Sequence, residues 1–286
     1  RWIVTGQGEK ILFFATEMEK EEIQTMIMAH ISGINEDKIL NNFYEKPTEK
    51  ERVYNALKIM DYYKDNFIFV RVGDPSIGQI KTLIRKEVLK YNIGYVFYDY
   101  IHTSMKILEE ISQRSGGVRL REDNILFLLS VKLKDICNEF GVFILSSTQL
   151  NGDWKTSEMP DQNLLRGAKS IADKIDCGMI LLDVTDEDLQ ALDGILKKDG
   201  LPQPNVKMSI YKNRRGSYNK CYLWMVADKA TCRFNSFFCT GYDYKYIAHK
   251  NLIARNADNI EEKVRGQAIE GIIVKGKNLE VLDHQD

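Results

Sequence analysis

The chain has 286 residues, a net charge of −1 and 44% hydrophobic residues, which is enough for one large domain or a domain with a tail. No apolar run approaches the roughly 20 residues that a membrane-spanning helix needs, so we expect no membrane partner. The near-neutral charge excludes a surface that is basic throughout, but it still allows a few loops to contact nucleic acid.

Apolar runs typical of buried strands alternate with segments of helical periodicity. Strands are expected at residues 11–15, 67–70, 95–98, 142–146 and 179–182. Most of these runs are apolar throughout, as in strands covered on both faces. Helical stripes between them are formed by Ile80, Leu83, Ile84, Val88 and Tyr91, and by Leu126, Leu129, Leu133, Ile136 and Phe140. The alternation predicts an α/β fold with a mostly parallel, twisted sheet and helices on both faces.

The stretch GDPSIGQIKT, residues 73–82, contains two glycines in the spacing of a phosphate-binding loop. Such a loop continues with Lys and then Ser or Thr, whereas Gln79 and Ile80 follow the second glycine here. Ser76 and Gln79 instead have the spacing of a capping box at a helix start. We therefore expect an ordinary β–α loop at this position, and no other stretch of the chain fits the phosphate-loop pattern.

The last third of the chain has a different pattern. Strands are expected at residues 206–211, 221–226 and 232–234, where they would close the sheet through hairpins. Residues 186–204 are polar and contain Gly and Pro, which predicts a long connection. The pattern weakens beyond about residue 239, so we expect one domain over residues 1–238 and an extension or tail over residues 239–286.

Five cysteines are scattered along the chain without a C-x-x-C pair. This odd, unclustered set argues against a disulfide framework and a zinc site, and it indicates a reducing compartment such as the cytoplasm. The chain begins with Arg and shows no signal peptide. We therefore expect it to be a fragment of a longer protein.

Polar residues with catalytic potential follow several of the predicted strands. Glu17 follows the first strand, where a carboxylate can orient and deprotonate a water. Asp99 ends another strand, as does an acid that holds the Mg²⁺ shell beside a nucleotide. Gln149 could sense a γ-phosphate, while Lys212 and Arg214, two residues apart on a strand, could clamp phosphate oxygens. Each pattern is also common at ordinary strand ends, so their order along the chain is the stronger evidence.

This order resembles the RecA-like core of DnaB-type replicative helicases over residues 11–234. The S-L-E-M motif of that family is similar to ATEM, its D-Y-L-Q motif to DYIH, and its S-Q-L-N motif to TQLN. Its K-x-R-x-G motif is similar to KNRRG, and LRGAKSIADKID at residues 165–176 resembles its pore-loop region. The chain departs from the family where His102 replaces the usual Gln and Gly152 an Arg.

The resemblance implies a role for each of these positions. Glu17 would be the general base, Asp99 the acid that holds Mg²⁺ through its water shell, and Gln149 the sensor that couples the γ-phosphate to DNA loops. Lys212 and Arg214 would reach into the ATP site of the neighbouring subunit. A further set, Arg166, Gly167 and Lys169, falls where the family's central-pore loop grips single-stranded DNA.

The resemblance also implies an ATP- and Mg²⁺-dependent DNA helicase that forms a homo-oligomer, expected to be a hexamer. It would translocate on single-stranded DNA in a bacterial cytoplasm or a phage-infected cell, with a primase or a loader as a further partner. The phosphate loop is expected ahead of residue 1, so residues 1–286 alone are expected to be inactive. Two alternatives remain open: another RecA-like ATPase such as a recombinase, and a non-catalytic ring subunit that binds nucleic acid.

Overall fold

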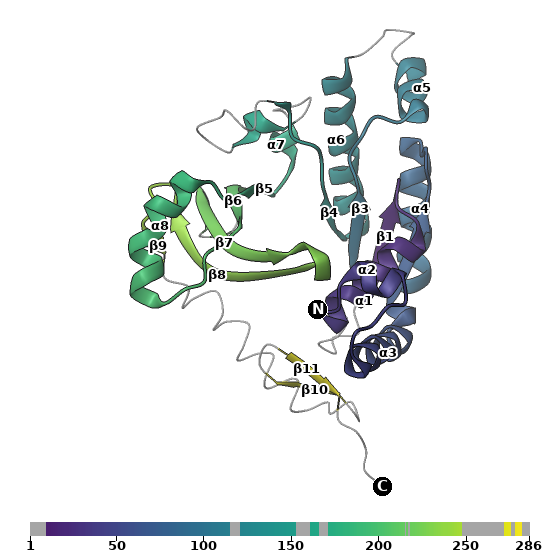
Figure 1. Ribbon diagram of the computed structural model, residues 1–286. Helices are drawn as coiled ribbons and strands as arrows, with labels where there is room; N and C mark the ends of the chain where they lie inside the picture. Colours follow the sequence, from purple (N-terminus) through teal and green to yellow (C-terminus); the bar gives the residue numbers. More distant parts are fainter. Residues whose placement is uncertain are drawn as a thin grey trace.

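Four of the predicted strands form a parallel sheet in the order β2-β1-β3-β4. They are β1 (Ile11–Ala15), β2 (Phe67–Arg71), β3 (Tyr95–Asp99) and β4 (Phe143–Ser146). The computed structural model describes residues 10–114, 121–152, 161–165, 171–214, 216, 218–247, 272–275 and 278–281. Figure 1 shows the parallel sheet standing beside a second sheet formed by the later part of the chain.

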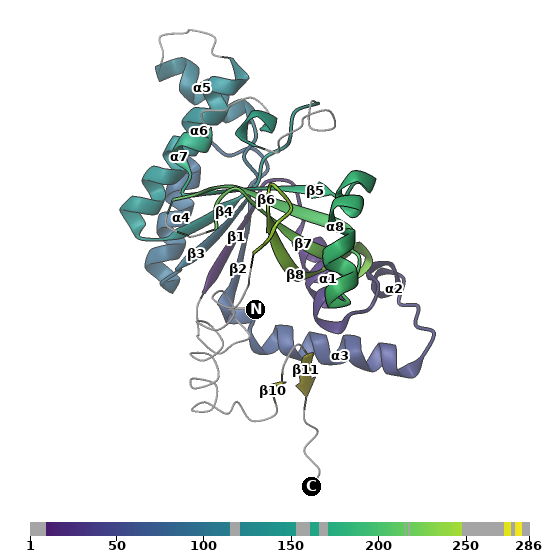
Figure 2. The ribbon, with the colours of Figure 1, turned by 90° about the vertical axis from the view of Figure 1, so that its left-hand side faces the viewer.

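Alternate side chains of the parallel sheet enter the main hydrophobic core. Leu12, Phe14 and Val96 are fully buried there, together with Ile80 and Ile84 of helix α4 (Ile77–Tyr91). Helices α5 (Met105–Arg114) and α6 (Glu122–Phe140) complete this layer. Figure 2 shows α4 and α6 on one side of the parallel sheet and α1 with the second sheet on the other side. Both predicted helical stripes are confirmed, because their periodicity marks the faces that α4 and α6 bury.

The capped helix predicted within residues 73–82 is confirmed. The backbone N–H of Gln79 donates to Ser76 Oγ at 3.2 Å, and Ser76 N–H donates to Gln79 Oε1 at 3.0 Å. Glu110 Oε2 accepts a further bond from Gly78 N–H at 3.2 Å. A carboxylate of the same chain thus occupies the N-terminus of α4, where a phosphate would otherwise be favoured.

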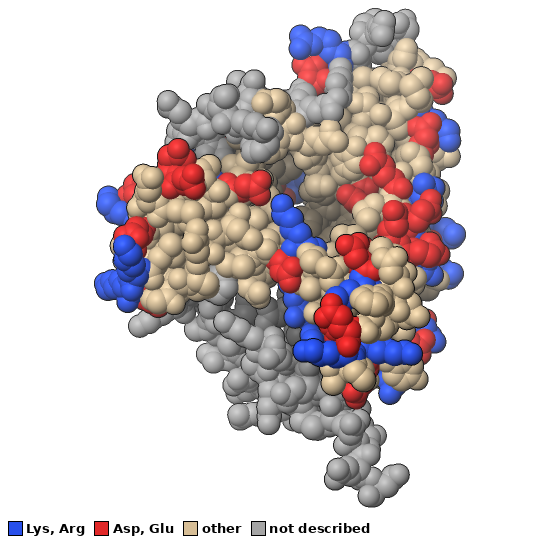
Figure 3. Space-filling model, in the orientation of Figure 1, with Lys and Arg blue, Asp and Glu red and all other residues tan. Residues whose placement is uncertain are grey.

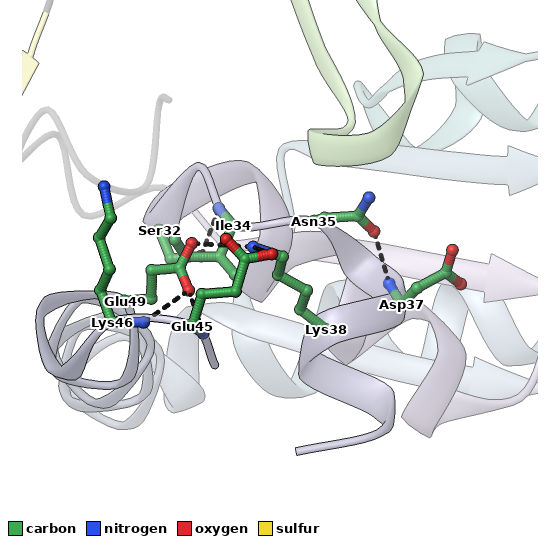
Figure 4. A network of polar contacts seen from close by, with 8 residues as sticks. All are labelled: Ser32, Ile34, Asn35, Asp37, Lys38, Glu45, Lys46 and Glu49. Atoms are coloured by element: carbon green, nitrogen blue, oxygen red, sulfur yellow. Dashed lines mark hydrogen bonds and ion pairs between the residues drawn. The ribbon is translucent and has the colours of Figure 1, made fainter. Parts of the chain in front are cut away.

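Helices α1 (Lys20–Ser32), α2 (Glu36–Leu40) and α3 (Pro47–Tyr62) follow β1 and return the chain to β2. Lys38 Nζ joins α2 to the start of α3 through Glu49 at 3.0 Å and Glu45 at 3.2 Å (Figure 4). Asn35 caps α2 by accepting from the backbone N–H of Asp37 at 2.8 Å. These contacts fix the tight connection between the two helices, and a short 3-10 turn (Lys64–Asn66) leads into β2.

The second sheet is antiparallel, with the order β5-β6-β7-β8-β9. Its strands are β5 (Cys177–Asp183), β6 (Val206–Asn213), β7 (Cys221–Asp228), β8 (Arg233–Gly241) and β9 (Tyr246–Ile247). A short 3-10 turn (Lys229–Thr231) connects β7 and β8, and a separate hairpin pairs β10 (Ile272–Lys275) with β11 (Asn278–Val281). The run predicted at residues 179–182 is a strand, but it pairs with β6 and not with the parallel sheet. Strand β8 also crosses the boundary expected at residue 238, and we propose that this sheet ends the main domain at Ile247.

The connection predicted at residues 186–204 is wrong for most of its length, because helix α8 (Asp186–Asp199) forms there. Thr185 and Asp188 make a capping box, and Gly200 ends the helix in the left-handed conformation with φ of 58°. Leu192 is fully buried and packs in a cluster with Tyr222 and Trp224 of β7. The glycine and prolines that suggested a connection lie mostly beyond the helix end.

A buried ion pair fixes α8 to the antiparallel sheet. Lys207 Nζ lies 2.6 Å from Asp188 Oδ2, and the Tyr244 hydroxyl donates to Asp188 Oδ1 at 2.6 Å. Burial acts to raise the pKa of Asp188, but the hydrogen bonds from Lys207, Thr185 and Tyr244 outweigh it and the pKa is lowered. Asp188 is therefore charged at neutral pH. In the part of the chain that the structure describes, no helix is long and apolar enough to cross a bilayer.

Tyr98 carries a hydroxyl that is buried and has no hydrogen-bond partner among the described residues. Its ring packs against Phe14 at a centroid distance of 5.3 Å, and burial raises the pKa of the phenol. We expect Tyr98→Phe to keep this packing and to raise the free energy of unfolding by up to about 1 kcal/mol, because an unsatisfied hydroxyl is removed. Urea denaturation measures the change, and a clear loss of stability would contradict this account.

Gly33 ends α1 with φ of 63°, and a Cβ built there would lie 2.6 Å from Nη1 of Arg233. Arg233 donates to the carbonyls of His30 and Ile31 at 2.8 and 3.0 Å, which joins α1 to the antiparallel sheet. We expect Gly33→Ala to lower the free energy of unfolding by about 1–2 kcal/mol.

Gly194 gives a matched control for this substitution. It lies inside α8, and a Cβ added there meets nothing within 4 Å. Gly194→Ala is therefore expected to raise the free energy of unfolding by about 0.5–1 kcal/mol. Thermal unfolding of both variants measures the two shifts, and equal shifts would contradict the role assigned to Gly33.

Candidate functional site

Three of the predicted polar residues gather at one edge of the parallel sheet. Strands β1, β3 and β4 are neighbours and run parallel, so their carboxyl ends lie side by side. Glu17 follows β1, Asp99 is the last residue of β3, and Gln149 follows β4. Glu17 and Gln149 are exposed, whereas Asp99 is half-buried. This edge is the candidate site.

Backbone hydrogen bonds beyond the strands hold the three strand ends together. Thr16 donates to the Asp99 carbonyl through both its N–H, at 2.9 Å, and its hydroxyl, at 2.8 Å. On the other side, Ile101 N–H donates to the Ser147 carbonyl at 2.9 Å, and Ser146 Oγ donates to the Tyr98 carbonyl at 2.6 Å. The segment after β3 is therefore fixed to its neighbours on both sides.

Tyr100 lies between the side chains of Glu17 and Gln149. Its hydroxyl donates to Glu17 Oε1 at 3.0 Å, and Gln149 Nε2 donates to the same hydroxyl at 3.5 Å. The ring also packs against His102 at a centroid distance of 5.1 Å, and His102 Nδ1 bonds the Tyr100 carbonyl at 3.0 Å. One phenol thus connects an acid and an amide that belong to different strands.

The electrostatics of this edge favour a cation. Partial burial raises the pKa of Asp99, and the negative charge of Glu17 raises it further, against the opposing effect of a hydrogen bond with Ser147. Arg71, the last residue of β2, lies 2.9 Å from Glu19 Oε1, and its Nη2 is 3.5 Å from the Glu17 carbonyl. A positive ion beside Asp99 would relieve the repulsion between the two carboxylates.

Lys212 and Arg214 lie elsewhere, at the end of β6 in the antiparallel sheet. Lys212 Nζ donates to the carbonyl of Ala172 in the short helix α7 (Ile171–Lys174), and Arg214 Nη2 donates to that of Asp173 at 2.8 Å. Burial and the charge of Arg214 lower the pKa of Lys212. The two cations share one face as predicted, but in this chain they contact α7 rather than Glu17.

The predicted DNA-binding residues Arg166, Gly167 and Lys169 lie outside the described residues. The segments on either side of them are described. Leu150, next to Gln149, forms a bridge with Leu165, and Asn151 N–H donates to the Leu164 carbonyl in the 3-10 turn Gln162–Leu164 at 2.8 Å. The chain leaving Gln149 is therefore fixed to the residues that directly precede Arg166.

Two residues of this edge were missed from the sequence. Arg71 ends the apolar run FIFVR, and Tyr100 follows Asp99 directly. A polar residue at the end of a predicted parallel strand was the signal that identified Glu17 and Asp99, and Arg71 carries the same signal. The position of the Tyr100 hydroxyl depends on the pairing of β1, β3 and β4, which the sequence does not specify locally.

Comparison with known proteins places this site in a family. The sequence pattern of the DnaB-like helicase C-terminal domain matches residues 2–236. The SPbeta prophage-derived uncharacterized protein YorI of Bacillus subtilis (strain 168) is 39% identical over 255 residues, covering 88% of this chain and 50% of that protein. A probable replicative DNA helicase of Trieres chinensis is 26% identical over 176 residues, covering 60% of this chain and 36% of that protein.

Two solved structures share the fold at 16% sequence identity. A DnaB-like replicative helicase, studied with its interactions with primase, gives a TM-score of 0.62 and covers 80% of this chain and 51% of that chain. A second structure, of an isolated ATPase domain, gives 0.63 and covers 82% of this chain and 76% of that chain. The predicted RecA-like α/β fold is confirmed. The chain spans about half the length of the prophage relative.

Proposed function

Because the chain belongs to the DnaB-like helicase C-terminal domain family, we propose that it is the ATP-driven motor of a ring-forming DNA helicase. The observation that supports this most strongly is the arrangement of Glu17, Asp99 and Gln149 at the carboxyl edge of β1, β3 and β4. In open parallel sheets, this edge is where nucleotides bind. An acid, a second acid and an amide together supply the groups that phosphoryl transfer to water requires.

Each residue at the edge has a proposed task. Glu17 is exposed beside the hydroxyl of Tyr100, so it can accept a proton from an attacking water. Asp99 would hold Mg²⁺ through its water shell, and the ion would neutralise charge on the ATP phosphates. The residues fit such an ion, because the charge of Glu17 and burial both disfavour a bare carboxylate at Asp99. Gln149 would hydrogen-bond the γ-phosphate and report its presence.

The ring arrangement gives Lys212 and Arg214 their proposed role. They would enter the ATP site of the adjacent subunit and stabilise negative charge in the transition state. The phosphate loop would lie ahead of residue 1, because residues 73–82 form a capped helix start with Glu110 at its N-terminus. ATP would thus bind between subunits, and a hexamer is the assembly we propose.

DNA contact is assigned to the segment that contains Arg166, Gly167 and Lys169. Figure 3 shows acidic and basic side chains interspersed over the visible face, rather than one extended basic surface. A local loop is therefore the better candidate for gripping single-stranded DNA, and the affinity should fall as salt rises. A primase or a loader would be a further partner of the whole protein, which we place in the cytoplasm of a bacterium or a phage-infected cell.

The proposal is tested with the full-length protein in three assays: ATP turnover with and without single-stranded DNA, unwinding of a forked duplex, and sedimentation to measure ring size. We expect DNA-stimulated turnover, unwinding and a closed oligomer. Strand pairing without unwinding would indicate a recombinase-like ATPase. Ring formation and DNA binding without turnover would indicate a non-catalytic ring subunit, and either result would overturn the helicase proposal.

A further inference from the structure

We propose that Tyr100 is a positioning residue through which Gln149 controls the orientation of Glu17. This inference rests on the proposed function, because it assigns regulation to the same site. The geometric basis is one hydroxyl that donates to Glu17 Oε1 at 3.0 Å and accepts from Gln149 Nε2 at 3.5 Å. A phenol hydroxyl both donates and accepts, so it can transmit a change in one partner to the other.

The surrounding backbone makes Tyr100 suitable for this task. Asp99 is held by Thr16 on one side, and Ile101 is held by Ser147 on the other, each through a backbone bond of 2.9 Å. Contacts with His102 also restrain the ring. Because Tyr100 itself is held in place, a displacement of Gln149 changes the hydrogen bonding of the hydroxyl rather than moving the whole loop.

The same chain of contacts continues toward the proposed DNA-binding segment. Gln149 is followed by Leu150, which forms a bridge with Leu165, and by Asn151, whose Nδ2 donates to the Asn163 carbonyl at 2.8 Å. Residues 166–170 come next. A strand held by that segment would therefore act on Gln149 through these contacts, and on Glu17 through Tyr100. The hydroxyl would make the orientation of the general base depend on bound DNA.

Tyr100→Phe in the full-length protein removes the hydroxyl and keeps the ring. We expect the turnover number with single-stranded DNA to fall roughly tenfold to a hundredfold, since a hydrogen bond to a charged group is lost. The KM for ATP should change little, and the ratio of turnover with DNA to turnover without it should fall. Tyr98→Phe is the matched control, because that hydroxyl has no partner among the described residues, and it should leave the ratio unchanged.

A double-mutant cycle with Gln149→Ala tests whether the two residues act together. If Tyr100 relays the state of Gln149, the double variant should be little worse than the poorer single variant. Effects on turnover that multiply independently would overturn the relay. An unchanged DNA-stimulation ratio in Tyr100→Phe would overturn it as well, because a merely structural tyrosine could lower stability without changing that ratio.

A readout that does not depend on activity separates this inference from the proposed function. In protein labelled with 3-fluorotyrosine, the ¹⁹F resonance of Tyr100 is identified by its loss in Tyr100→Phe. We expect it to shift in Glu17→Ala and in Gln149→Ala. A resonance unmoved by both substitutions would overturn the bridge even in an active ATPase. A wild-type protein without ATP turnover would contradict the proposed function, while the resonance would still decide the bridge.

Discussion

Replacing Glu17 with glutamine is expected to lower ATP turnover in the full-length protein by about 10²–10⁴-fold, the usual contribution of a general base. Glutamine has nearly the same shape and can still accept a hydrogen bond from the Tyr100 hydroxyl, but it cannot take a proton from water. Because Glu17 lies apart from the proposed DNA-binding segment, single-stranded DNA binding should persist. Steady-state ATP turnover and fluorescence anisotropy with labelled DNA measure the two properties.

Glu19→Gln is the matched control for this prediction. Glu19 is an exposed acid two positions further along the chain, and it pairs with Arg71 at 2.9 Å. Its loss removes a surface ion pair worth at most about 1 kcal/mol, so turnover should stay near the wild-type rate. Normal turnover in Glu17→Gln would remove Glu17 from its role. An equal loss in both variants would mean that charge near β1, rather than proton transfer, limits the rate.

The sequence predicted the elements that are determined locally. The apolar runs identified β1 to β4, and Ser76 with Gln79 identified the start of α4, because these signals depend on neighbours in the chain. Helix α8 was missed because its acidic first turn made the segment look polar, although Thr185 and Asp188 have capping-box spacing. The partner of β5 could not be predicted, because strand pairing is decided by contacts distant in sequence.

The candidate site divides in the same way. Glu17, Asp99 and Gln149 could be identified because each follows an apolar strand, and the structure brings their strand ends to one edge. Tyr100 could not, because its hydroxyl connects two residues that lie 83 and 49 positions away in the chain. Their roles in catalysis, like those of Lys212 and Arg214, remain predictions.

Arg214→Ala is expected to spare nucleotide binding and to lower hydrolysis in the assembled ring by roughly 10³–10⁵-fold, as for other arginines that stabilise a phosphoryl-transfer transition state. In the single chain, Arg214 contacts the Asp173 carbonyl at 2.8 Å and Asp176 Oδ1 at 3.6 Å, and half of its side chain is exposed. Exposed ion pairs contribute at most about 1 kcal/mol. Leaving these contacts therefore costs far less than the several kcal/mol that correspond to the expected rate loss.

Lys134→Ala distinguishes this role from a structural one. Lys134 also pairs with Asp176, at 2.5 Å, so its loss disturbs the same acid near α7 without removing the proposed arginine finger. It should leave turnover nearly unchanged. Mixing Arg214→Ala with Glu17→Gln subunits adds the decisive test, because some interfaces then combine an intact Glu17 with an intact Arg214 from the neighbour. Restored turnover is expected in the mixture, and its absence would contradict action between subunits and leave Arg214 as a residue that only holds α7.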